Sequence, residues 1–127
     1  MATASQVITR ALKRLRVLPS GTTQTSDETT DCLEALNDML HEWSIDGIDL
    51  AHTTLLSTDA LDVPDDHIGP IADNLAMRVA DMFGAQVSQL LAMDAQAGKA
   101  ALVAYHFTIA DLTDDNPLGS SNLASED

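Results

Sequence analysis

The sequence predicts an all-α protein: a four-helix bundle-like domain over residues 1–112, followed by a flexible acidic tail at 113–127. Apolar residues make up 45% of the 127 residues but aromatic residues only 3%. Alanine, leucine, isoleucine and methionine must therefore form the core, and these residues favour helix over strand. Four stretches repeat apolar residues at the three- and four-residue spacing of amphipathic helices. The last residues are polar and acidic without periodicity, which is typical of a segment that orders only on a partner.

The first helix is expected over residues 4–16, ended by Pro19 and Gly21. Its apolar face carries Val7, Ile8, Ala11, Leu12 and Leu15. The opposite side and its flank carry four of the six basic residues of the chain, which are Arg10, Lys13, Arg14 and Arg16. Their place in the later turns suits the negative end of the helix dipole.

The second helix is expected within Ser26–Asp49, with Gly47 ending it. Thr25 forms a capping box with Glu28 in one interpretation, and Ser26 is a plain N-cap in the other. The apolar face of this helix includes Cys32 and Trp43. We expect Cys32, the only cysteine, to be a buried thiol and Trp43 to lie in the core.

The opposite face of this helix is an acidic row within about 80° of arc. The row consists of Asp27, Asp31, Glu34, Asp38 and Glu42. Like charges at this spacing destabilise an isolated helix by roughly 0.2–0.5 kcal/mol per pair, so each neighbouring pair in the row adds a small repulsion. Three uses remain open: a solvated face, a contact with the basic first helix of a neighbouring copy, and a wall that repels passing DNA.

The pattern weakens over residues 50–63, where we expect a short extended arm or hairpin between the second and third helices. The third helix follows a turn at Pro64, has Pro70 in its first turn and ends at Gly84. The fourth runs from about Val87 to Asp111. One line of residues recurs along it: Leu91, Ala95, Gly98, Leu102, Tyr105, Ile109 and Leu112. The small residues Ala95, Gly98 and Ala101 would let another helix approach closely.

The formal net charge of −14 disfavours a simple nucleic-acid-binding domain and an anionic membrane surface. Between Val17 and Met77 there are thirteen acidic residues and no lysine or arginine. No apolar run or signal-peptide pattern indicates a membrane or secreted protein, so we expect a soluble cytosolic chain.

Catalytic motifs are also missing from the sequence. It has no glycine-rich phosphate loop, paired-cysteine site or paired-histidine zinc motif. The four histidines are scattered, and His67 is expected in the turn that leads into the third helix. Twenty acidic residues guarantee chance carboxylate pairs, which therefore carry no information. We expect neither an enzyme nor a metal or cofactor site.

Three stretches resemble, in order and spacing, the head-to-tail adaptor family of tailed bacteriophages, also called head-completion or tail accessory factors. They are ATASQVITRALKRLRVL at 2–18, LEALNDMLHEWSIDGI at 33–48 and ADNLAMRVADMFGAQVS at 72–88, joined through VPDD at 63–66. The resemblance covers roughly residues 2–112. It departs from the family pattern where a basic residue usually follows the tryptophan of the second helix, since Ser44, Ile45 and Asp46 stand here.

The resemblance implies a non-enzymatic virion protein at the head–tail junction, present in the host cytoplasm before assembly. Such proteins form a ring, typically of twelve copies, beneath the portal after packaging. They extend a channel through which DNA passes without specific binding, and they present a docking surface to tail or stopper proteins. We expect the four basic residues of the first helix at subunit or portal contacts, and the C-terminal tail on the portal or an adjacent subunit. The alternative is an acidic DNA mimic that occupies a basic groove on a host DNA-binding protein.

Overall fold

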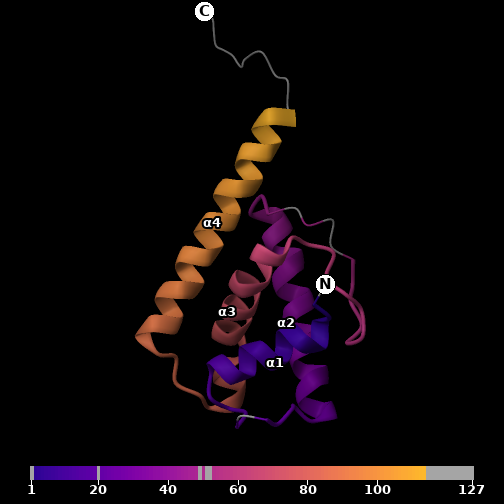
Figure 1. The fold of residues 1–127 in the computed structure, drawn as a ribbon, viewed down its shortest axis with the longest axis vertical. Helices are drawn as coiled ribbons and strands as arrows, with labels where there is room; N and C mark the ends of the chain where they lie inside the picture. Colours follow the sequence, from indigo (N-terminus) through magenta and orange to yellow (C-terminus); the bar gives the residue numbers. More distant parts are fainter. Residues whose placement is uncertain (1, 20, 49, 51–52, 114–127) are drawn as a thin grey trace, which may run out of the picture.

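A computed structural model describes residues 2–19, 21–48, 50 and 53–113 and confirms the all-α fold (Figure 1). The described elements, in chain order, are α1 (Ala4–Arg14), α2 (Ser26–Ile45), the 3-10 helix η1 (Asp65–His67), α3 (Ile68–Val79), the 3-10 helix η2 (Ala80–Phe83) and α4 (Gln89–Thr113). Helix α3 lies at the centre and contacts the other three helices, while α1 crosses in front of α2. Helix α4 lies along α3 and extends beyond the rest of the domain. Apart from Thr113, the expected tail lies outside the described residues.

The predicted apolar faces form one continuous core. Helix α1 buries all five expected residues, and α2 buries Cys32, Leu36, Met39, Leu40 and Trp43. Both Cys32 and Trp43 are thus in the core, as expected. Helix α3 is buried along most of its length through Ile71, Ala72, Leu75, Ala76 and Val79. Each fully buried large aliphatic side chain contributes about 1.5–3 kcal/mol relative to exposure, so these faces hold the helices together.

Side-chain caps begin the first two helices. Thr25 and Glu28 form the capping box of α2, so the alternative cap at Ser26 is wrong. Thr3 and Gln6 form an equivalent box at the start of α1. Each box satisfies backbone N–H groups that have no partner within the helix.

Helix α1 ends earlier than predicted, at Arg14 rather than at residue 16. Val17 donates its N–H to the Leu12 carbonyl and Arg16 donates to that of Lys13, the two bonds of a Schellman motif. Arg16 occupies the left-handed position of this motif, with φ of 61°, where glycine is the usual residue. The helix therefore stops before Pro19, and because position 16 is an arginine and not a glycine, no residue type marks this stop.

Glycines do end α2 and η2. Gly47 has φ of 95° and follows the cap of α2, as predicted, although the helix itself stops at Ile45. Gly84, with φ of 62°, ends the third helical segment, whose last residues tighten into η2. A side chain at either position would be strained in this conformation.

The segment between α2 and α3 is an extended arm rather than a hairpin. It pairs with the N-terminus of the chain through an antiparallel bridge between Thr3 and Ala60. The Asn37 side chain of α2 also donates to the Leu55 carbonyl at 3.1 Å and accepts from the Leu55 N–H at 2.8 Å. These contacts fix the arm against both α1 and α2, and the described residues of the arm form no strand pair with one another.

Helix α4 packs on α3 through the predicted small residues, with one exception. Pro70, in the first turn of α3 as expected, lies directly against Gly98, and Ala95 is buried. Ala101, in contrast, is exposed and does not face α3. The buried line of α4 is Leu91, Ala95 and Leu102, with Gly98 half-buried among them. Tyr105 is partly exposed, and the side chains of Ile109 and Leu112 lie outside the described part.

Candidate functional site

The acidic row lies on the solvent side of α2. Asp27, Asp31, Glu34, Asp38 and Glu42 are all exposed. Among the described residues, the first four make no ion pair, and only Glu42 pairs, with Arg78 of α3. The acidic side of α2 also affects the only cysteine of the chain. Burial, and to a smaller extent the negative charges of Asp31 and Glu28, raise the pKa of the Cys32 thiol to about 11. That thiol stays protonated at neutral pH and is a poor nucleophile.

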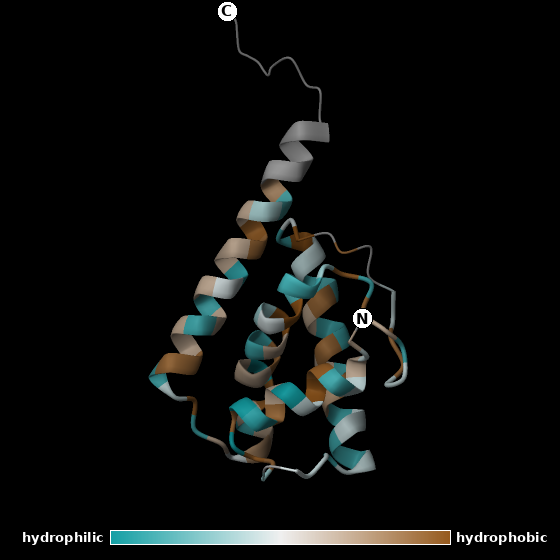
Figure 2. Ribbon diagram, viewed as in Figure 1, coloured by the Kyte–Doolittle hydropathy of each residue, from teal (hydrophilic) through white to brown (hydrophobic). Residues whose placement is uncertain are grey.

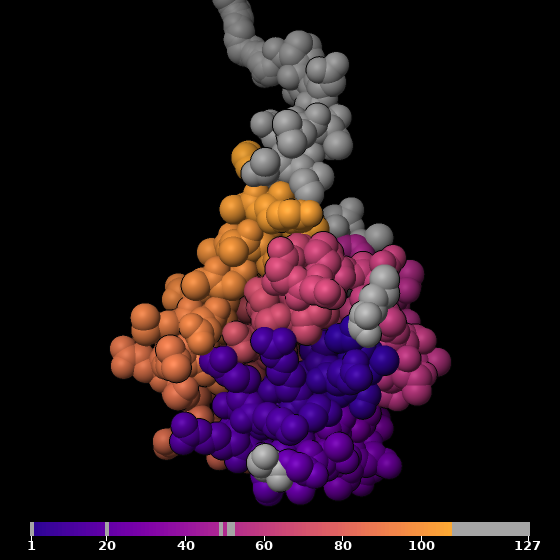
Figure 3. All heavy atoms as spheres, in the orientation of Figure 1, coloured from indigo at the N-terminus to yellow at the C-terminus, as the bar shows by residue number. Residues whose placement is uncertain are grey.

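The basic residues of α1 divide into two groups. Arg10, Lys13 and Arg16 are exposed and make no ion pair within the described ranges. We call these three the basic face. Arg14 instead turns inward: it donates to Asp94 of α4 at 3.0 Å and its Nε lies 3.6 Å from Asp73 of α3. Figure 3 shows α1 spread across one face of the molecule beside α4.

Asp73 is the one buried carboxylate beside this basic helix in the described structure. Its Oδ1 has no hydrogen-bond partner. Burial raises the pKa of Asp73 above its ordinary value, and the positive charges of Arg14 and Arg10 offset only part of this rise. Asp94 adds a smaller upward contribution. The carboxylate therefore belongs to the packing of α1 on α3 and not to an accessible site.

Two ion pairs tie α4 to the charged helices on either side of it. Arg14 of α1 bonds Asp94, and Lys99 bonds Asp46, just after α2, at 3.0 Å. Asp94 and Lys99 lie about 140° apart around α4, one on each side of its buried line. The two ion pairs thus place the end of α1 on one side of the buried line of α4 and the end of α2 on the other. This arrangement depends on contacts between distant parts of the chain, and sequence reasoning did not identify Asp94 or Lys99.

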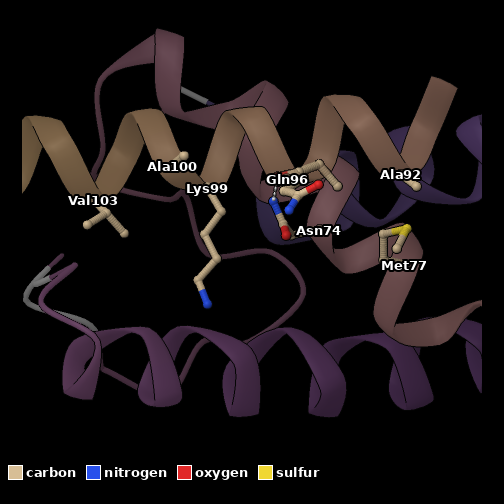
Figure 4. A pocket seen from close by; sticks show the side chains of 8 residues that line it. Asn74, Met77, Ala92, Gln96, Lys99, Ala100 and Val103 are labelled. Atoms are coloured by element: carbon tan, nitrogen blue, oxygen red, sulfur yellow. Dashed lines mark hydrogen bonds between the residues drawn. The ribbon is translucent and has the colours of Figure 1, made fainter. Parts of the chain in front are cut away.

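An apolar groove of about 510 Å³ lies beside the second of these pairs (Figure 4). Its lining comes from α3 and α4 and includes Asn74, Met77, Ala92, Lys99 and Val103. Lys99 extends from α4 across the opening towards α2, and its ammonium lies 5.9 Å from the centre of the Trp43 ring. Most of its lining residues are apolar, so the groove offers apolar contact to another molecule.

Three aromatic side chains form a separate cluster where η1 meets α4. His67 is buried in the turn that leads into α3, as predicted, and its Nδ1 lies 2.8 Å from Asp66. Its Nε2 lies 3.2 Å from His106, and its ring meets Tyr105 edge-on. In the described residues no group of three or more His, Cys, Asp or Glu side chains is placed to hold a metal ion. The contact between His67 and His106 joins η1 to α4.

Within the described residues, no helix is both long and apolar enough to cross a membrane. No known family model matches the chain, and no curated protein matches its sequence. Three features of the described residues are placed to contact another molecule: the acidic row, the basic face and the groove. The sequence predicted the first two, except that Arg14 is committed within the chain.

Proposed function

We propose that this chain is a head-to-tail connector of a tailed-phage virion, which assembles as a ring on the portal and carries the DNA channel towards the tail. One observation carries the proposal: two exposed faces of opposite charge, the basic face around α1 and the acidic row of α2, belong to one folded domain. Among the described residues, neither face is neutralised by side chains of its own chain, apart from the Glu42–Arg78 pair. A surface of this kind fits the complementary surface of another copy. The portal and the tail protein are proposed as further partners because residues 2–112 resemble the adaptor family.

Contacts between two different faces of identical subunits are head-to-tail contacts, and these generate closed rings when the rotation closes. The spacing of the charges suits such a contact. Arg10 and Lys13 are three residues apart, as are Asp31 and Glu34, so each pair spans about 4.5 Å along its helix. Opposite potentials also steer two copies into this orientation and disfavour acidic-to-acidic approach.

Charge reversal tests the ring contact. We expect Arg10→Glu/Lys13→Glu and Asp31→Lys/Glu34→Lys each to abolish ring formation alone. An equimolar mixture of the two variants should restore rings, because each altered face then meets an altered or original face of opposite charge. Asp62→Lys/Asp65→Lys is the control, since both residues are exposed outside the row. Rings that form normally from either single-face variant would overturn this contact.

Binding to the portal tests the function itself. The full chain is mixed with the portal ring of the same phage and imaged by electron microscopy with class averaging. The connector assignment requires an added layer of density that continues the ring. A chain that stays monomeric and leaves the portal unchanged would contradict it.

The acidic row also suits a channel wall, because clustered carboxylates repel phosphates. In that case Asp31→Lys/Glu34→Lys/Asp38→Lys would leave the ring intact but impair DNA passage. The exposed row equally favours the second candidate, a DNA mimic bound in a basic groove. Affinity capture separates the two, since a mimic recovers a host DNA-binding protein that DNA displaces, whereas a connector recovers the portal.

A further inference from the structure

Three polar side chains form a line of hydrogen bonds between η1 and α4. His67 is only 2% exposed, and each of its two ring nitrogens has a partner. Its Nδ1 lies 2.8 Å from the Asp66 carboxylate, and its Nε2 lies 3.2 Å from Nε2 of His106. We call the rings of His67 and His106 the histidine pair. His106 belongs to the C-terminal part of α4, which continues past the other helices (Figure 2).

The two distances determine where the protons of the histidine pair lie. An ionised carboxylate only accepts hydrogen bonds, so Nδ1 of His67 must carry a proton, which it donates to Asp66. Two ring nitrogens form a hydrogen bond only when one carries a proton and the other does not. In the neutral pair Nε2 of His106 therefore donates, and Nε2 of His67 accepts.

The histidine pair can hold one added proton but not two. With one, a single proton still lies between the two Nε2 atoms, and the Asp66 carboxylate balances the positive charge. With two, both Nε2 atoms carry a proton, so two N–H groups and two positive charges face each other across 3.2 Å. Burial adds to this penalty, because the charged ring of His67 would be shielded from water.

Other charged and titratable groups, from three elements, lie near the histidine pair. Asp65 is exposed on η1, and Tyr105 of α4 meets His67 edge-on, with ring centres 5.0 Å apart. The Arg10 guanidinium of α1 reaches the backbone of Gly69, where an added Cβ would lie 3.2 Å from Nη2. Nearby carboxylates favour the first positive charge on the pair, whereas Arg10 adds to the repulsion against a second.

From this geometry we propose that the histidine pair is an acid-sensitive switch. It holds α4 on η1 while the two rings share a hydrogen bond, and it releases this part of α4 when both rings are protonated. Leu102 is the last buried apolar residue among the described side chains of α4. Repulsion within the pair therefore acts on a helix end with little apolar burial, and not on the core. The switch does not rest on the connector proposal, because it needs neither a second copy nor a portal.

The first test follows both rings of the full chain by NMR from about pH 8 to about pH 4.5. At the higher pH the ring nitrogen shifts should show opposite tautomers, with the proton on Nδ1 in His67 and on Nε2 in His106. As the pH falls, the rings should take up protons in two steps at least about one pH unit apart, because the first charge opposes the second. At the second step the backbone amides of residues 103–107 should become about tenfold less protected from hydrogen exchange, since a helix segment without packing is marginally stable. The same tautomer in both rings, or protection that does not change with pH, would overturn the proposal.

A side chain that cannot be charged tests the cause. His106→Gln keeps an N–H that can donate to Nε2 of His67, but it removes one of the two protonation sites. At about pH 4.5 the amides of residues 103–107 in this variant should keep their neutral-pH protection within about twofold. His41→Gln is the matched control, because His41 is an exposed histidine of α2 outside the pair, and this variant should lose protection as the unaltered chain does. Equal loss in His106→Gln and in the unaltered chain would overturn the switch. Circular dichroism confirms that each variant is folded at neutral pH, and if His106→Gln is not, the ring shifts of the unaltered chain decide the outcome.

Discussion

At the scale of single residues, Asp73 is a carboxylate whose burial between α1 and α3 is energetically unfavourable. Its carboxylate is buried with an Oδ1 that accepts no hydrogen bond, and the nearest guanidinium atom of Arg14 is 3.6 Å away. That distance is too long for a hydrogen bond, and Arg14 bonds Asp94 instead. Burial dominates, so the pKa of Asp73 is raised in the folded chain.

This raised pKa has a definite consequence for stability. Below the ordinary pKa of 3.8, Asp73 is protonated in both folded and unfolded chains and costs nothing. As the pH rises above 3.8 the unfolded chain releases the proton first, so the free energy of unfolding falls until the pH passes the raised folded-state pKa. We expect Asp73→Asn to raise the free energy of unfolding at pH 7 by on the order of 1 kcal/mol, because it removes a poorly compensated buried charge.

Urea unfolding at a series of pH values measures this effect. The difference between Asp73→Asn and the unaltered chain should shrink as the pH falls towards 3.8. Asp94→Asn is the matched control: it weakens a half-exposed ion pair, which is worth less than about 1 kcal/mol and has the opposite sign. A stability gain for Asp73→Asn that is equal at pH 3 and pH 7 would show that the charge is not its cause.

At the scale of elements, α4 packs closely on the first turn of α3. A Cβ added at Gly98 would lie 2.9 Å from the Pro70 Cβ and 3.2 Å from its Cα. Neither atom belongs to the end of a flexible side chain, so the helices would have to separate. We therefore expect Gly98→Ala to destabilise the protein by about 1–3 kcal/mol, against the intrinsic preference of helices for alanine.

Thermal unfolding checks this expectation. Ala101→Gly gives the reference for the same helix, because position 101 is exposed and should lose about 1 kcal/mol through helix propensity alone. If Gly98→Ala is as stable as the unaltered chain or more so, α4 does not depend on this close approach.

The elements also show what local sequence patterns can and cannot predict. Periodicity identified all four helices, and local signals limited the cap of α2 to Thr25 or Ser26, of which Thr25 is the cap, and correctly marked the Gly47 stop. The end of α1 was wrong because the Schellman hydrogen bonds place Arg16, and not a glycine, in the left-handed conformation. The pairing of the arm with residues 2–5 joins segments far apart in the chain, and nothing local encodes it.

The sequence also predicted the candidate surfaces only in part. The acidic row is exposed as its spacing indicates, since all five residues share one face of α2. The basic residues were predicted as a single set, yet Arg14 turns to Asp94 and Asp73, and only the packing of α3 and α4 determines this.

At the scale of the whole molecule, the proposed ring contact should weaken as salt is added. The contact between the basic face and the acidic row depends on attraction between exposed charges, whose range falls from about 10 Å at 0.1 M to 3 Å at 1 M ionic strength. Sedimentation of the unaltered chain between about 0.05 and 1 M NaCl should therefore pass from large assemblies to smaller species. Arg10→Glu/Lys13→Glu should form no large assembly at any of these salt concentrations. Assemblies that persist unchanged in 1 M NaCl would mean that apolar burial, and not charge, holds the copies together.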